Sequence, residues 1–242
     1  MDLVVALYGE SLQWLLDVPP EYNIHVMNMG LPAIPDGPRS YELHVIQDAG
    51  FESWAYANYI LFNWDKLPEW MVMVQANPFD HAAAATDPGV APNFIERLKQ
   101  LPALMAEPAL FFIPIGNFNK CSIDEPLPFK QARMFPRSPK VIYNVTVGEG
   151  TNGEEVLTPS CPLRDVYGYL FRPTEDIPAE TTWSWGNMFA VRREPVVALG
   201  WEFWKRLSEI LEHAPKPIEG AALERLWPSI ILEGSKRANR AV

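Results

Sequence analysis

Cysteine, basic charge and long hydrophobic runs are all scarce in this sequence. Its 2 cysteines, Cys121 and Cys161, have no partner at metal-ligand spacing, which excludes a disulfide-stapled scaffold and leaves open whether the two pair. The 20 basic residues are outnumbered by 30 acidic ones, so nucleic acid and anionic membranes are disfavoured as partners. No stretch approaches the roughly 18 to 20 apolar residues of a membrane span, and no signal peptide is evident. We therefore expect a soluble, cytoplasmic protein.

The chain has the size and composition of one globular domain covering residues 1–242. It contains 242 residues, of which 48% are hydrophobic and 21% charged, and single cores grow until about 250 residues. Its 24 prolines and 14 glycines follow no repeat. The 9 Trp, 8 Tyr and 12 Phe are numerous, and aromatic side chains serve first cores and then flat ligands.

Apolar runs alternate with helical periodicity along the chain. The runs at 3–7, 70–75 and 110–113 have the length and composition of buried strands, whereas 50–64 places aromatic residues at helical spacing. This alternation predicts an α/β fold with a mostly parallel central sheet and helices on both faces. Further elements are expected as follows: a strand from Thr181 to Val191 interrupted by Gly186, a long helix from Glu194 to about His213, a helix from Ala221 to about Leu232 that Pro228 breaks or kinks, an insertion or lid at 116–160, and a flexible tail at 234–242.

Turn-forming polar residues follow the apolar run at 70–75. Asn77, Asp80 and His81 stand at its carboxyl end, where ligands collect in open α/β sheets. A carboxylate beside an imidazole can bind a metal or transfer protons. The alternative is that Asp80 only caps the alanine-rich segment that follows.

Four blocks of the sequence resemble the family named domain of unknown function 3431. The first is Val4 to Leu15, with the sequence VVALYGESLQWL, which resembles that family's opening strand and turn. The other blocks agree in order and are Glu52 to Tyr59 with Asn63 to Pro68, Val72 to His81, and Gly186 to Glu194 leading to Leu223 to Pro228. Together they span nearly the whole chain outside 92–180.

The same blocks are similar, more widely, to nucleotide-sugar glycosyltransferases of the GT-A type. This resemblance implies a Rossmann-related, GT-A-like domain that transfers a sugar from a nucleotide-sugar donor to a small-molecule acceptor. It implies that the turn with Tyr8 and Glu10 holds the nucleotide, and that the late segment with Asn187 shapes the acceptor site. An acidic motif after the 70–75 strand would bind Mn²⁺ or Mg²⁺ on the leaving diphosphate, whose charge a metal neutralises.

This chain departs from that pattern at the metal motif. Asn77-Pro78-Phe79-Asp80 offers one carboxylate, so Asp80 would hold the metal with help from Asn77 or His81. Glu52 or Glu224 would be the catalytic base. Met29 and Phe51 stand where the family usually has Lys and Arg, which removes two cations from the expected diphosphate site.

These departures define a second hypothesis and a third. The second is a specialised-metabolite enzyme, such as a cyclase, transferase or hydrolase, that reuses the fold without nucleotide or metal. It would act on an aromatic or apolar small molecule through Glu52, Asp80 and His81. The third is a binding module that retains only the pocket.

Several candidate residues also have purely structural interpretations. Trp183 and Trp185 are expected to alternate on one strand face, where they form, with Trp54, either aromatic walls of a cleft or part of the core. Glu52 could serve only the helix dipole, and Glu224 could pair with Arg225. The remaining histidines have no ligand spacing and are interpreted as structural or exposed; they are His25, His44 and His213.

Overall fold

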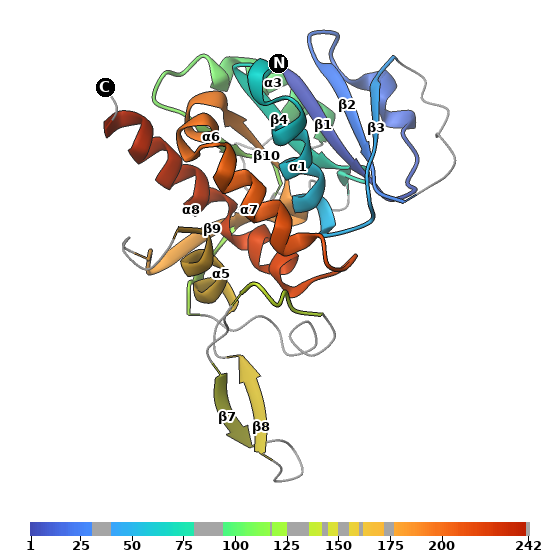
Figure 1. Cartoon of the computed structure of the whole chain (residues 1–242). Helices are drawn as coiled ribbons and strands as arrows, with labels where there is room; N and C mark the ends of the chain where they lie inside the picture. Colours follow the sequence, from blue (N-terminus) through green and yellow to red (C-terminus); the bar gives the residue numbers. More distant parts are fainter. Residues whose placement is uncertain are drawn as a thin grey trace.

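A six-stranded mixed sheet forms the centre of the molecule (Figure 1). The computed structural model describes residues 1–30, 40–79, 94–116, 118–124, 136–141, 145–149, 155–159, 162–171 and 177–240. The strand order is β3-β2-β1-β4-β10-β5. These strands span Asp2–Leu7 (β1), Asn23–Asn28 (β2), Glu42–Val45 (β3), Trp70–Gln75 (β4), Phe112–Pro114 (β5) and Phe189–Arg192 (β10).

The first four strands of the chain are mutually parallel, and β10 is antiparallel to both of its neighbours. The chain builds the sheet from β1 outward to β2 and β3 on one side, and then returns to place β4 on the other side of β1. The sheet order therefore reverses between β1 and β4. Crevices at the carboxyl ends of the two strands that flank such a reversal are the usual ligand sites of open α/β sheets.

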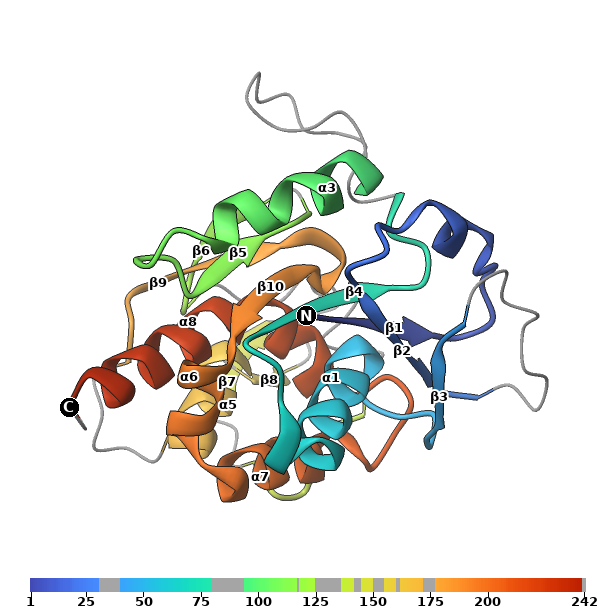
Figure 2. The same ribbon diagram turned by 90° about the horizontal axis from the view of Figure 1, so that it is seen from above.

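Helices cover both faces of the sheet, as the sequence predicted (Figure 2). Alternate residues of β1 face opposite ways, so that Val4 and Ala6 pack under α1, α7 and α8, whereas Leu3 and Val5 pack under η1 and α3. The helices are α1 (Phe51–Phe62), α3 (Phe94–Met105), α5 (Pro162–Phe171), α6 (Arg193–Leu199), α7 (Trp201–Leu211), α8 (Ile218–Arg240) and the short η1 (Gln13–Asp17), η2 (Trp64–Lys66) and η3 (Trp185–Asn187). None of these helices combines the length and apolarity that a membrane span requires.

The segment at 116–160 contributes strands outside the central sheet. Phe118–Ser122 (β6) pairs antiparallel with Glu180–Ser184 (β9), and Val145–Glu149 (β7) pairs with Glu155–Pro159 (β8). The β7–β8 ribbon projects away from the central layers in Figure 1. The prediction that this segment acts as a lid stays a prediction.

The segment from Thr181 to Val191 is interrupted at Gly186, at φ 67°, as expected, but its two parts, β9 and β10, are separated by η3 and belong to different sheets. Two element boundaries differ from those expected. Gly200, at φ 83°, divides the expected long helix into α6 and α7. The last helix passes Pro228 without ending and continues to Arg240, where a flexible tail was predicted from 234. Glu233 stabilises this extension by pairing with Lys236 and Arg237 at helical spacing.

Candidate functional site

A small hollow lies where the sheet order reverses, at the carboxyl ends of β1 and β4. Its volume is about 400 Å³, and its lining combines polar groups with aromatic rings: Glu10, Ser11, Trp14, Ala76, Asn77 and Phe79. The Glu10 carboxylate accepts a 2.8 Å hydrogen bond from the Tyr8 amide, which fixes the turn after β1. Trp14 donates from Nε1 to the Ala76 carbonyl at 2.8 Å and therefore ties the first turn to the end of β4.

The start of α1 brings Glu52 towards the same end of the sheet. Gly50 and Phe51 both have left-handed backbone conformations, with φ of 61° and 56°. Their amides donate to the carbonyls of Ala214 and Pro215 in the link between α7 and α8, at 3.0 and 3.4 Å. A left-handed Phe costs on the order of 1 kcal/mol, so these tertiary contacts hold a conformation that the local sequence does not favour.

Glu52 is a carboxyl group whose pKa lies near neutrality. Its pKa is raised from 4.5 to about 7, chiefly by burial of the carboxyl and also by Glu224 and Glu10, while its own backbone amide and Lys216 oppose the rise. The residue as a whole is only partly buried. A group that is half protonated near pH 7 can both accept and donate a proton.

Glu224, on α8, is a second partly buried carboxyl group beside Glu52. Burial raises its pKa, while Arg225 and the backbone amide of Gly186 lower it. Arg225 is not a tight partner, because its Nη1 lies 4.0 Å from Glu224 Oε2 and its guanidinium stacks 4.7 Å above the Trp183 ring. Arg225 therefore only partly offsets the effect of burial, and the pKa of Glu224 stays raised.

Two tyrosine hydroxyl groups near these carboxyls are buried without a hydrogen-bond partner among the described residues. Burial, followed by the charge of Glu52, raises the pKa of Tyr8 and of Tyr56, so both are neutral phenols at any ordinary pH. Trp54 Nε1 and Asn187 Oδ1 are likewise unpaired in the described structure. A buried polar atom without a partner costs about 1 to 3 kcal/mol, so the neighbouring hydroxyls of Tyr8 and Tyr56 indicate a place where a ligand or water completes the bonding.

Ser53 joins three elements around this region. Its Oγ accepts hydrogen bonds from Asn187 Nδ2 at 2.9 Å and from Trp227 Nε1 at 3.0 Å. The hydroxyl therefore fixes the first turn of α1 against η3 and α8. Because Glu52 and Glu224 lie on two of these elements, Ser53 maintains their spacing.

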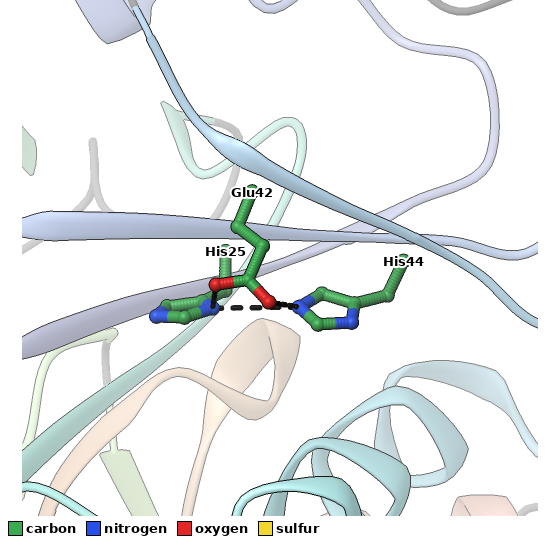
Figure 3. Close-up of side chains that lie close together, drawn as sticks. All are labelled: His25, Glu42 and His44. Carbon is green, nitrogen blue, oxygen red and sulfur yellow. Dashed lines mark hydrogen bonds and ion pairs between the residues drawn. The ribbon is translucent and has the colours of Figure 1, made fainter.

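A second cluster, which the sequence analysis missed, lies on β2 and β3 (Figure 3). The Glu42 carboxylate lies between the rings of His25 and His44, with Oε2 3.5 Å from His25 Nδ1 and Oε1 3.3 Å from His44 Nε2. Asp2 contacts the other nitrogen of His25. Burial raises the pKa of Asp2, but hydrogen bonds from His25, Tyr59 and Asn23 lower it more. Burial lowers the pKa of His44 against the opposing charge of Glu42. The signal in the sequence was Glu42-Leu43-His44, whose alternation places both polar side chains on one face of a strand.

The predicted site residues fall into three groups. Tyr8, Glu10, Glu52 and Glu224 lie near enough to influence one another electrostatically, and Asn77 shares the hollow with Glu10, whereas Tyr8, Glu52 and Glu224 are not part of its described lining. Asn187 joins them through Ser53, whereas Trp54 and Trp183 are buried, and Trp183 lies against Arg225. The remaining residues and side chains lie outside the described part of the structure: Asp80, His81, Cys161 and the ring of Trp185.

Met29 and Phe51, which stand where the resembled family usually has Lys and Arg, lie in different surroundings. Met29 has no exposed surface and packs in the core beneath α1. Phe51 is partly buried, and its ring lies so close to Gly220 that a Cβ there would be 2.5 Å from Phe51 Cδ2. Both side chains therefore complete the packing of α1 rather than leave an open cavity.

No family model, curated protein or solved structure matches the chain. The resemblances described from the sequence therefore stay predictions, and functional inference rests on the site itself.

Proposed function

We propose that this protein is an enzyme that transfers protons to or from a small molecule bound at the carboxyl ends of β1 and β4. Glu52 would be the proton-transferring group. The observation that carries the proposal is the convergence of Glu52 and Glu224 with the unpaired hydroxyls of Tyr8 and Tyr56. Proton transfer at neutral pH requires such a carboxyl group of raised pKa together with neutral hydrogen-bond donors.

The charge of the region favours a neutral or cationic substrate. Glu10, Glu52 and Glu224 contribute three carboxyl groups, and no Lys or Arg lines the described hollow. Lys216 influences Glu52 only as the weakest contribution, and Arg225 is stacked on a tryptophan. An anionic diphosphate would lose hydration here without gaining close cations. A ring-bearing substrate would instead gain contact with Trp14 and Phe79, which supports the class of specialised-metabolite enzymes.

Each group then has a role that follows from its surroundings. Glu52 accepts a proton from a substrate hydroxyl or amine and returns it to a leaving group. Tyr8, a residue that is only partly buried, donates a hydrogen bond to a substrate oxygen whose charge increases in the transition state, while Tyr56 is fully buried in the core behind it. Glu224 raises the pKa of Glu52 and stabilises positive charge that develops on the substrate.

Loss of turnover in Glu52→Gln tests this proposal. Purified protein is incubated with pooled neutral, cationic and anionic metabolites, and consumption is followed by mass spectrometry. We expect turnover of a neutral or cationic compound with a pH inflection near the pKa of Glu52, lost at least a hundredfold in Glu52→Gln, since general acid–base groups contribute roughly that factor or more. Glu107→Gln, on an exposed loop, is the matched control. Turnover unchanged in Glu52→Gln would contradict the proposal.

Sugar transfer from a nucleotide donor is a second candidate, supported by Asn77 at the reversal of the sheet order. In that case Asp80 would bind Mn²⁺ or Mg²⁺, and Asp80→Asn should weaken the binding of UDP or GDP at least tenfold, about 1.4 kcal/mol. Calorimetry with each nucleotide, with and without Mn²⁺, distinguishes the two candidates. Metal-dependent nucleotide binding would favour sugar transfer over the first proposal.

A further inference from the structure

The side chains of His25, Glu42 and His44 share one face of the sheet because of strand register. His25 pairs with Glu42 across β2 and β3, and Met27 pairs with His44, so all three polar side chains project to the face that carries α1. This is the edge of the sheet, where β3 has four residues and the hollow beside it is lined in part by Asp2, His25, Glu42 and Lys66. Two imidazoles and a carboxylate therefore meet beside open space.

The environment of His25 determines which of its nitrogens faces the cluster as an acceptor. Nε2 lies 3.2 Å from Asp2 Oδ2. Asp2 in turn accepts hydrogen bonds from Tyr59 and, at 3.0 Å, from Asn23 Nδ2, so it can serve His25 only as an acceptor. The proton of a neutral His25 is therefore on Nε2, and the lone pair of Nδ1 points towards Glu42 and His44. A carboxylate that orients a histidine in this way is the usual support of a metal ligand.

The separations of the donor atoms match a tetrahedral ion. Ligands about 2.05 Å from zinc at tetrahedral angles are about 3.3 Å apart, whereas ligands at right angles around an octahedral ion are about 3.0 Å apart. His25 Nδ1 and His44 Nε2 are 3.4 Å apart, Glu42 Oε2 lies 3.5 Å from His25 Nδ1, and Glu42 Oε1 lies 3.3 Å from His44 Nε2. One oxygen of Glu42 lies within 4.8 Å of both nitrogens, so rotation of the carboxylate about its own side-chain bonds brings three ligand atoms around one tetrahedral ion without movement of the strands.

We propose that His25, Glu42 and His44 bind Zn²⁺, with water from the neighbouring hollow as the fourth ligand. Two histidines and one carboxylate are a donor set that zinc uses in proteins with an open coordination position. Such an ion would link the short edge strand β3 to β2. Asp2 acts through His25 as a positioning residue.

The zinc site is independent of the proposed catalytic site. Asp2 begins the six-residue strand β1 and Tyr8 follows its last residue, so the strand places them about 20 Å apart. Loss of zinc binding and loss of turnover can therefore be measured as separate failures.

Competition between the protein and a chromophoric chelator for Zn²⁺ tests the proposal. We expect one Zn²⁺ per chain, an affinity at least tenfold lower in Glu42→Gln and in His44→Asn, and no change in His213→Asn, which removes an imidazole from a different place. Asp2→Asn should lower the affinity about tenfold, as loss of a supporting carboxylate does. Mg²⁺ should not compete, because it requires octahedral oxygen ligands.

Visible absorption of the Co²⁺-substituted protein reports the coordination geometry of the metal ion. Substitution of Co²⁺ should give the intense visible absorption of a tetrahedral complex, and Glu42→Gln and His44→Asn should abolish it. Circular dichroism checks that Glu42→Gln and His44→Asn are folded. If one of them is unfolded, the Zn²⁺ affinity and Co²⁺ absorption of the other variant test the proposal. Absence of stoichiometric Zn²⁺ binding, or affinity unchanged in the folded cluster variants, would overturn the proposal.

Discussion

Replacement of Glu52 by Gln should stabilise the folded protein at alkaline pH while leaving its stability at mildly acidic pH nearly unchanged. The folded-state pKa of Glu52 is raised from 4.5 to about 7. Below the lower value, the group is protonated in both the folded and the unfolded state. As pH rises from the lower value through the folded value, the unfolded chain has released the proton while the folded protein still holds it, so the free energy of unfolding falls and then stays constant above the folded value.

The magnitude follows from the size of this shift. A shift of one pKa unit corresponds to about 1.4 kcal/mol, so the shift of Glu52 sets an upper bound of about 3 kcal/mol. Partial exposure of the side chain and the loss of a carboxylate from the first turn of α1 reduce the expected gain to about 2 kcal/mol. Glutamine retains the shape of the side chain and removes only its ionisation.

Urea unfolding at pH 4 and pH 8 measures this effect. We expect Glu52→Gln to unfold at a higher urea concentration than the parent protein at pH 8 and at about the same concentration at pH 4, which lies below the unfolded pKa. Glu107→Gln should change stability little at either pH, because Glu107 is exposed. A destabilisation of Glu52→Gln that is equal at the two pH values would refute the argument that Glu52 is a desolvated carboxyl group.

Three further predictions concern stability and can be checked by urea unfolding at neutral pH. Ser53→Ala should lower the free energy of unfolding by about 2 kcal/mol, because it leaves two buried N–H donors unpaired. Ser229→Ala removes one hydrogen bond, from Ser229 to the Thr181 hydroxyl, and should cost about 1 kcal/mol. Equal costs would contradict the view that Ser53 accepts two hydrogen bonds. Gly234→Ala should destabilise the folded protein by about 1 to 3 kcal/mol, because the added Cβ would lie 2.3 Å from a carbonyl oxygen of α6. In Gly168→Ala, on α5, the added Cβ meets no atom within 4 Å, so this variant should stabilise the protein by about 0.5 to 1 kcal/mol. Tyr22→Phe should cost about 1 kcal/mol, because the hydroxyl donates a 2.7 Å bond to a buried carbonyl; a gain in stability would show that this bond contributes nothing.

The sequence was sufficient to predict three strands of the main sheet, two central and one at its edge, and the layered architecture. The apolar runs at 3–7, 70–75 and 110–113 indicated buried strands, and they lie in one sheet with helices on both faces. Strands that are covered on both faces have little polar sequence, so composition alone identifies them. Composition does not determine which strands pair with one another. The position of β10, antiparallel between β4 and β5, was therefore not predicted.

The site was only partly predictable, because tertiary packing creates it. Glu52 and Glu224 were candidates from local patterns, but their proximity depends on how α1 packs against α8. His25 was set aside because no ligand spacing surrounds it in the sequence. Its pairing with Glu42 depends on the register of β2 and β3, and a shift of one residue would turn Glu42 and His44 to the opposite face.

The helices α7 and α8 lie near the carboxyl terminus, which affects how the protein folds during its synthesis. These helices cover the apolar face beneath α1, including Val4 and Met71, which the ribosome produces much earlier. Until α8 leaves the ribosome, one apolar face of the paired strands is exposed to solvent, and such a face favours association with other chains. Folding of the larger core is therefore delayed until the helices of residues 201–240 are available, and efficient production of the protein should depend on chaperones that shield this surface during translation.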